Sequence, residues 1–147
     1  MNRLISTKGR YALRLMIDIA SYSNGSPVTL KDVSKRQDVS IKYLEQVVSL
    51  LLKRGYLISI RGNNGGYLLS KDPKEYTAGD IIRCAEGTLA PVACLQTDCN
   101  VCPRKDICST LDFWKGFYDV VNNYVDSVTL DDLRNEELLK IGNDYSI

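Results

Sequence analysis

The order of folding signals between residues 29 and 70 constrains the fold of this chain more than any other feature. Thr29-Leu-Lys-Asp32 has the form of a capping box, which starts a helix expected to end near Arg36. Ser40 is a favourable N-cap for a second, longer helix with one apolar face. Two helices joined by so short a turn are typical of a helix-turn-helix. The spacing therefore predicts that the chain folds around this motif.

A hairpin is expected directly after the two helices. Two strand-like runs, residues 56–61 and 67–70, enclose Gly62-Asn-Asn-Gly-Gly66. An Asn-Gly pair supplies the positive φ angles that a tight hairpin turn requires. A helix-turn-helix followed by such a hairpin predicts a winged DNA-binding domain over residues 1–77, with Arg61 at the entrance to the wing.

The remaining elements predict a mainly α-helical fold with this small β-hairpin wing. Helices are expected from Thr7 to about Ser23, from Thr77 to Cys84 or Ala85, from Thr110 onward and, in short form, after Thr129. The chain then divides into the DNA-binding domain, a linking helix with a cysteine-rich loop (78–108), and a long dimerisation helix with a short terminal helix (109–147).

The long helix is expected to pair with a second copy of the chain. Its apolar residues recur at spacings of three and four, at positions Leu111, Trp114, Tyr118, Val121 and Val125. A short heptad of this kind packs against another helix, which is either the core of its own domain or a partner subunit. We favour the partner, because winged regulators read two half-sites as symmetric dimers, and Trp114 and Phe117 are then the natural anchors.

Charge divides the chain into a basic and an acidic half. Residues 1–77 carry 13 Lys and Arg against 6 Asp and Glu, a net charge of +7, whereas residues 78–147 have a net charge of −6. A basic half suits a polyanion, because neutralising phosphates releases counterions. The alternative is an accidental asymmetry of solvated faces. We therefore expect the N-terminal half to bind double-stranded DNA.

The second helix of the motif presents the candidate recognition surface. Its outward residues are Lys42, Tyr43, Glu45, Gln46 and Ser49. Gln can pair with adenine and Glu can accept from the cytosine amino group, so this face can read bases. Basic side chains expected to hold phosphates are Lys8, Arg10, Lys31, Lys35 and Lys42. The alternative is an ordinary solvated helix.

Four of the five cysteines lie within residues 94–108, at the spacing Cys94-x4-Cys99-x2-Cys102-x5-Cys108. The chain has no long apolar run or secretory signal, so we expect it in the cytoplasm and off the membrane, where thiols stay reduced. Clustered thiolates there indicate tetrahedral zinc or an iron–sulfur cluster, with a metal-free thiol switch as the alternative.

The fifth cysteine and the lack of catalytic motifs bear on the chemistry of the chain. Cys84 stands apart within a helix and is interpreted as a buried apolar filler. The chain contains no histidine, no phosphate-binding glycine loop and no convincing nucleophile–base pair, so the sequence does not predict an enzyme.

These segments resemble the Rrf-type family of bacterial winged-helix regulators, the group of IscR, NsrR and CymR. The resemblance covers nearly the whole chain, and its clearest segments are Ile5-Ser-Thr-Lys-Gly-Arg-Tyr-Ala-Leu-Arg14, Ser40-Ile-Lys-Tyr-Leu-Glu-Gln46, Ser59-Ile-Arg-Gly-Asn-Asn-Gly-Gly-Tyr67 and Thr77-Ala-Gly-Asp-Ile-Ile82. It implies a homodimer, expected to repress operators of genes for iron–sulfur biogenesis, nitrosative stress or sulfur metabolism. The implied DNA contacts are Ser40, Tyr43, Glu45, Gln46 and Arg61.

The resemblance also implies a cluster held by three loop cysteines, 2Fe–2S in preference to 4Fe–4S, but the ligands depart from the family patterns. Cys102 and Cys108 keep the spacing of the last two cysteines, while the first is expected at Gln96. The position of the histidine ligand of IscR is Leu111, and that of the NsrR aspartate is Arg10; neither can ligate iron.

We therefore favour four thiolates as the ligand set, Cys94, Cys99, Cys102 and Cys108, with three cysteines and one unidentified ligand as the alternative. CymR-type relatives lack the loop cysteines and act through a protein partner, and Leu89-Ala-Pro-Val92 is similar to that branch. Two other functions stay open: a thiol switch without a cluster, and a zinc-stapled structural module.

Overall fold

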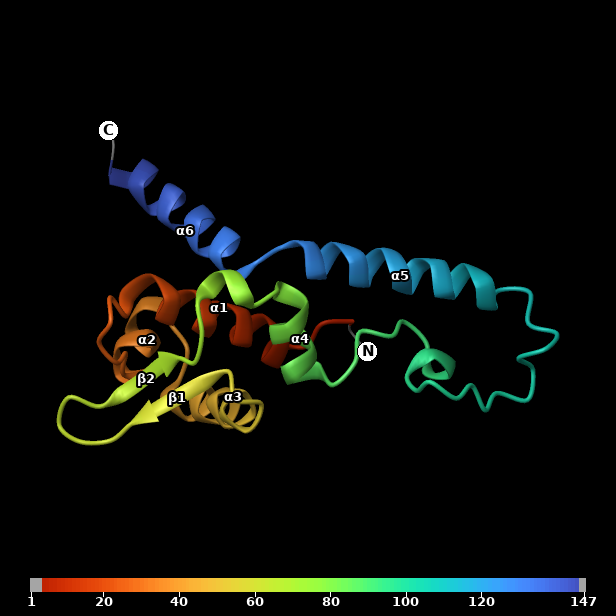
Figure 1. Cartoon of the computed structure of the whole chain (residues 1–147), viewed down its shortest axis with the longest axis horizontal. Coiled ribbons are helices and arrows are strands. Elements are labelled where there is room, and N and C mark those ends of the chain that lie inside the picture. The colour runs from red at the N-terminus through yellow and green to blue at the C-terminus, as the bar shows by residue number, and fades with distance from the viewer. Residues whose placement is uncertain (1–3, 146–147) are drawn as a thin grey trace.

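The computed structural model describes residues 4–145 and confirms the predicted fold class, mainly α with a small β-hairpin wing (Figure 1). Its elements are α1 (Thr7–Tyr22), α2 (Leu30–Gln37), α3 (Ile41–Lys53), β1 (Leu57–Ile60), β2 (Gly66–Leu69), the 3-10 turn η1 (Pro73–Glu75), α4 (Ala78–Glu86), the 3-10 turn η2 (Ala93–Leu95), α5 (Leu111–Ser127) and α6 (Leu130–Tyr145). Among these residues, no helix is long and apolar enough to cross a membrane.

Local capping sets the helix boundaries close to where the sequence predicts them. The Ser40 hydroxyl accepts a hydrogen bond from the Tyr43 amide (3.2 Å) at the start of α3, and Asp38 adopts the left-handed conformation that ends α2. At Thr77 and Thr129 the capping boxes are complete, with both reciprocal bonds between 2.9 and 3.0 Å. Each box satisfies helix-end amides that would otherwise lack partners.

The hydrophobic core surrounds α1, which packs against α2, α3, α4 and α6. Large apolar side chains from four helices are fully or almost fully buried there: Leu15, Met16, Ile19, Leu44, Val47, Leu51, Ile81 and Leu130. A buried carboxylate, Asp18, joins the first two helices by accepting hydrogen bonds from Arg36 (2.7 and 3.0 Å) and Gln37 (3.0 Å). This network fixes the turn between α2 and α3 against α1.

The wing is an antiparallel hairpin in which Leu57 pairs with Leu69 and Ile60 with Gly66. A bridge that the sequence did not predict attaches it to the body: Val28 and Tyr67 exchange backbone hydrogen bonds of 2.8 and 2.9 Å. Gly66 has a φ of 151°, and a side chain there would collide with the Val28 backbone. The wing is therefore held firmly against the helix-turn-helix.

The last two helices are arranged differently from each other. The helix after Thr129 was predicted to be short, but α6 has 16 residues. Its first turn packs on α1, where Leu130 is fully buried, and farther along the helix Glu137 accepts a hydrogen bond from the Ser21 hydroxyl (2.9 Å). α5 extends away from the body, and its start follows the loop that comes after α4 (Figure 1). Sequence periodicity indicated a terminal helix but not how far it continues.

Candidate functional site

The exposed face of α3 and the first turn of α1 form one open groove of about 520 Å³. It is lined by Lys8 from α1 and by Lys42, Glu45, Gln46, Ser49 and Leu50 from α3. Four of the predicted DNA-contacting residues (Lys8, Lys42, Glu45, Gln46) are thus brought together and exposed. Two lysines beside hydrogen-bonding side chains can hold phosphates while neighbouring groups reach base edges.

Three other predicted contact residues do not line this groove. Arg10 is exposed on α1, and Ser40 is exposed at the start of α3, where its hydroxyl serves as the N-cap. The ring of Tyr43 is half-buried and packs edge-on against Tyr11, with centroids 5.2 Å apart. Burial of the phenol raises the pKa of Tyr43 above its ordinary value. Tyr43 therefore also fixes α3 against α1.

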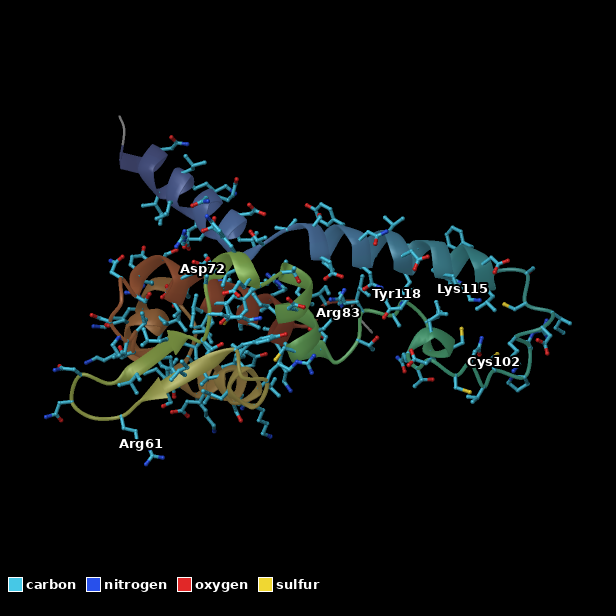
Figure 2. All side chains as sticks on the ribbon, viewed as in Figure 1. Arg61, Asp72, Arg83, Cys102, Lys115 and Tyr118 are labelled. Carbon is cyan, nitrogen blue, oxygen red and sulfur yellow. The ribbon has the colours of Figure 1, made fainter. Side chains whose placement is uncertain are left out.

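Arg61 lies at the end of β1 and is fully available to a partner. Its side chain points out from the wing, on the far side of the molecule from the cysteine loop (Figure 2). The loop that follows contains Gly62, with a φ of 111°, and Gly65, where a side chain would collide with the Ile60 carbonyl oxygen. These glycines allow a tight turn, in which the backbone can approach a binding partner closely.

The cysteine loop spans residues 87–110 between α4 and α5. Cys94 lies in η2, Cys99 is exposed, and Cys102 and Cys108 are partly exposed; all are free thiols. Within residues 4–145, no three potential ligands converge into a ready-made metal site. The donor chemistry nevertheless fits a soft metal or cluster, since four thiols and no histidine are available in one irregular loop. The loop would have to tighten to bring them together.

Two cysteines have contacts that set their reactivity. Cys108 lies 3.5 Å from the Thr110 hydroxyl, whose hydrogen bond, together with backbone amides at the start of α5, lowers the pKa of the thiol. Cys84 instead donates to the Leu50 carbonyl oxygen (3.4 Å) between α4 and α3, where burial raises the pKa of its thiol. Cys84 packs against the core as predicted for a filler, but it is partly and not fully buried.

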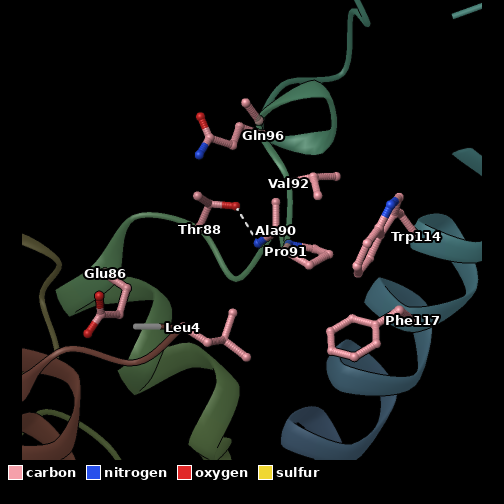
Figure 3. A pocket seen from close by; sticks show the side chains of 10 residues that line it. Leu4, Glu86, Thr88, Ala90, Pro91, Val92, Gln96, Trp114 and Phe117 are labelled. Carbon is pink, nitrogen blue, oxygen red and sulfur yellow. Dashed lines mark hydrogen bonds between the residues drawn. The ribbon is translucent and has the colours of Figure 1, made fainter. Parts of the chain in front are cut away.

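Two adjacent apolar faces run along α5. The stripe from Leu111 to Val125 is half-buried, and Trp114 and Phe117 line a cavity of about 620 Å³ shared with the cysteine loop (Figure 3). The exposed apolar residues form a neighbouring stripe, which we call the outer face: Phe113, Phe117, Val120 and Tyr124. These residues are spaced by four, three and four positions, which the sequence shows. Spacing alone could not decide which of the two adjacent apolar faces of α5 lies against the cysteine loop.

The C-terminal end of α5 is fastened to α4 by a polar cluster that the sequence did not predict. Arg83 on α4 donates to Asp126 (2.8 and 2.9 Å) and to Asn122 (2.8 Å) on α5. Next to it, Ala78 donates to the Val128 carbonyl oxygen (2.8 Å), and Gly79 leaves no room for a side chain beside Asp126. These contacts join residues about 40 or more positions apart, so no local pattern could reveal them.

An exposed recognition helix, a basic groove and a wing with a free arginine define a winged-helix DNA-binding protein. The chain belongs to the Rrf2 family, described as iron-dependent transcriptional regulators, whose model matches residues 5–136.

The relatives point to two branches of that family. The chain is 37% identical to the regulator IscR of Pectobacterium atrosepticum over 93% of this chain and 83% of the relative, and 36% identical to IscR of Escherichia coli over 93% and 84%. Among solved structures, CymR, the global cysteine regulator of B. subtilis, is 39% identical with a TM-score of 0.75, covering 92% of this chain and 98% of that one. IscR of T. potens is 32% identical with a TM-score of 0.69, covering 97% and 90%. The chain is therefore a DNA-binding transcriptional regulator and not an enzyme.

Proposed function

We propose that this regulator is a cytoplasmic homodimer, acting as a repressor, whose operator binding is set by an iron–sulfur cluster on Cys94, Cys99, Cys102 and Cys108. The observation that supports it is the location of four free thiols in the one segment that joins the DNA-binding half to the start of α5. A 2Fe–2S cluster is preferred to 4Fe–4S, with zinc as the alternative occupant.

The two ends of α5 explain how such a loop can affect DNA binding. The C-terminal end is fixed by Arg83, Asp126 and the backbone bonds around Val128. The start follows directly on the cysteine loop, because α5 begins three residues after Cys108. When bound, a cluster would cross-link the limbs of the loop and so fix the start of α5 relative to the end of α4.

Dimerisation is assigned to the outer face of α5. Phe113, Val120 and Tyr124 are 63 to 69% exposed, and an apolar groove of about 470 Å³ runs from Phe113 past Gly116 to Val120. A Cβ at Gly116 would meet nothing within 4 Å, so a second helix can approach closely there. A second copy of α5 would bury this face and place two recognition helices on one DNA duplex.

Val120→Glu is expected to raise the dissociation constant of the dimer about 100-fold or more, because a carboxylate buried without a partner costs roughly 3 kcal/mol. The matched control is Lys115→Glu, which adds the same side chain on the opposite side of α5, where the residue is exposed. Analytical ultracentrifugation over a concentration series measures the constant. A Val120→Glu protein that stays dimeric as tightly as the control would place the interface elsewhere.

The function is tested on operators selected from fragments of the source genome. Footprinting is expected to show two protected half-sites related by a dyad, and the affinity of cluster-loaded protein is expected to differ at least tenfold from that of chelator-treated protein. Equal affinities in the two forms would refute control by the cluster while leaving DNA binding intact.

A specific observation favours one second candidate, a regulator of sulfur metabolism that senses oxidation without a cluster. The likeness to CymR of B. subtilis covers almost all of both chains, and the lowered pKa of Cys108 favours its reactive thiolate form. This candidate predicts reversible disulfides in metal-free protein, and operator affinity that changes with oxidant alone.

A further inference from the structure

A single carboxylate connects the start of the cysteine loop to the DNA-facing turn of α1. Glu86 is the last residue of α4, and its Oε1 accepts three hydrogen bonds: from the Ser6 amide (2.8 Å), the Ser6 hydroxyl (2.5 Å) and the Gly9 amide (3.1 Å). The Ser6 hydroxyl in turn accepts from the Lys8 amide (3.2 Å). A continuous hydrogen-bond chain therefore runs from Glu86 to the backbone of a residue in the DNA-binding groove.

Glu86 is unfavourably placed for the dipole of its own helix, α4, and favourably placed for the dipole of α1. An acidic residue in the last turn of a helix opposes the helix dipole, so Glu86 is unfavourably placed in α4 itself. The first turn of α1 contains no acidic residue of its own. Glu86 supplies the missing negative charge, because its carboxylate accepts hydrogen bonds from the Ser6 and Gly9 amides at the positive end of α1.

Packing around the carboxylate leaves little freedom. A Cβ on Gly9 would lie 2.5 Å from Glu86 Oε1 and 3.1 Å from Ile5 Cγ2, so only glycine permits α1 to approach this closely. Gly87, with a φ of 85°, ends α4 immediately afterwards and starts the cysteine loop. Figure 3 shows Glu86 at the end of α4, on the edge of the cavity that Trp114 and Phe117 line from α5.

We propose that Glu86 is a positioning residue for operator binding, which holds the first turn of α1 so that Lys8 meets the DNA phosphates beside α3. This inference rests on the proposed DNA-binding role of Lys8 and adds a residue that itself makes no DNA contact. Because Glu86 adjoins the loop, a change in the loop's conformation reaches the groove through the same carboxylate.

The test is operator affinity and its salt dependence in metal-free protein, measured by fluorescence anisotropy with a labelled operator. Losing the Lys8 contact in both protomers removes about two phosphate contacts, so Glu86→Ala is expected to bind about 10- to 100-fold more weakly and to lower the log–log salt slope by roughly 2. Glu86→Gln keeps an acceptor oxygen in place and should bind more tightly than Glu86→Ala. Glu136→Ala, an exposed substitution on α6, is the matched control and should bind like wild type.

A double-variant comparison separates positioning from a general loss of structure. If Glu86 acts through Lys8, Glu86→Ala/Lys8→Ala will bind within about twofold of Lys8→Ala alone. Gly9→Ala perturbs the same contact from α1 and is expected to give the same reduced salt slope, with far-ultraviolet circular dichroism confirming the folded state of each variant.

The outcomes distinguish this inference from the function on which it rests. Wild-type affinity for Glu86→Ala, or multiplicative losses in the double variant, would overturn the positioning role. The positioning role also fails if Glu86→Ala weakens binding while Lys8→Ala does not. If Lys8→Ala and Arg61→Ala both bind as wild type, the DNA-binding surface itself is wrong, and the proposed function fails with it.

Discussion

Replacing Cys102 or Cys108 with serine is expected to abolish bound iron while leaving the fold intact. Serine is a poor ligand for the soft iron of a thiolate-held cluster, so a four-thiolate site cannot tolerate either change. Neither cysteine belongs to the hydrophobic core, so the free energy of unfolding of the metal-free protein should change by only about 0.5 kcal/mol. Iron and sulfide analysis after anaerobic purification, with urea unfolding in parallel, measures both effects.

The control for this prediction is Cys84→Ser. It is the same chemical change, but the Cys84 side chain points from α4 toward α3. There it donates a hydrogen bond to the Leu50 carbonyl oxygen and packs against the core. The Cys84→Ser protein should keep its iron and have a lower free energy of unfolding. The Cys102 and Cys108 variants should instead lose iron and keep their free energy of unfolding. Full retention of iron in both the Cys102 and Cys108 variants would remove them from the ligand set.

The same experiment on Cys94 and Cys99 decides between the two ligand sets. If all four thiols bind the cluster, Cys94→Ser and Cys99→Ser each lose iron as completely as the other two. If three cysteines and another residue serve, one of these two variants retains a full cluster. Cys94 lies in η2 beside the cavity and Cys99 is exposed, so both are accessible to a cluster once the loop tightens.

Arg61→Ala is expected to weaken operator binding by about 30-fold or more, since an arginine contact in each of two wings is lost at roughly 1–3 kcal/mol apiece. The side chain is exposed and stands on a hairpin anchored through Val28 and Tyr67, so its loss should leave the fold unchanged. Lys140→Ala is the matched control, because it removes an exposed positive charge from α6, away from the wing (Figure 1).

The Arg61 prediction is measured by titrating a labelled operator at several salt concentrations. If Arg61 contacts phosphate, the salt slope falls by about 2 per dimer; if it reads a base edge, affinity falls while discrimination between operator variants relaxes. Unchanged affinity at fixed salt would remove the wing from the DNA interface.

Most of the fold could be predicted from local signals in the sequence. N-cap residues such as Ser40, Thr77 and Thr129 act within one helical turn, and the Asn-Gly pair acts within one hairpin, so their effects follow from spacing alone. The exposed groove residues on α3 could be predicted for the same reason, because helical periodicity separates them from the buried Leu44 and Val47.

Long-range relationships could not be predicted in this way. Glu86 meets Ser6 across 80 residues and Arg83 meets Asp126 across 43, and nothing in the local sequence marks either pair. α5 carries apolar residues on two adjacent faces, so periodicity could not separate the face toward the cysteine loop from the exposed one. The set of cysteine ligands could not be predicted for another reason. The thiols lie in an irregular loop, where no helical or strand period fixes their positions relative to one another.

The metal content and visible spectrum of the protein purified without oxygen show directly whether it binds an iron–sulfur cluster. An iron–sulfur sensor of this kind should be brown, with bands between roughly 320 and 460 nm, and should hold about two irons and two sulfides per chain for the preferred cluster. Colourless protein holding stoichiometric zinc, or protein that stays metal-free after reconstitution with iron and sulfide, would contradict an iron–sulfur sensor.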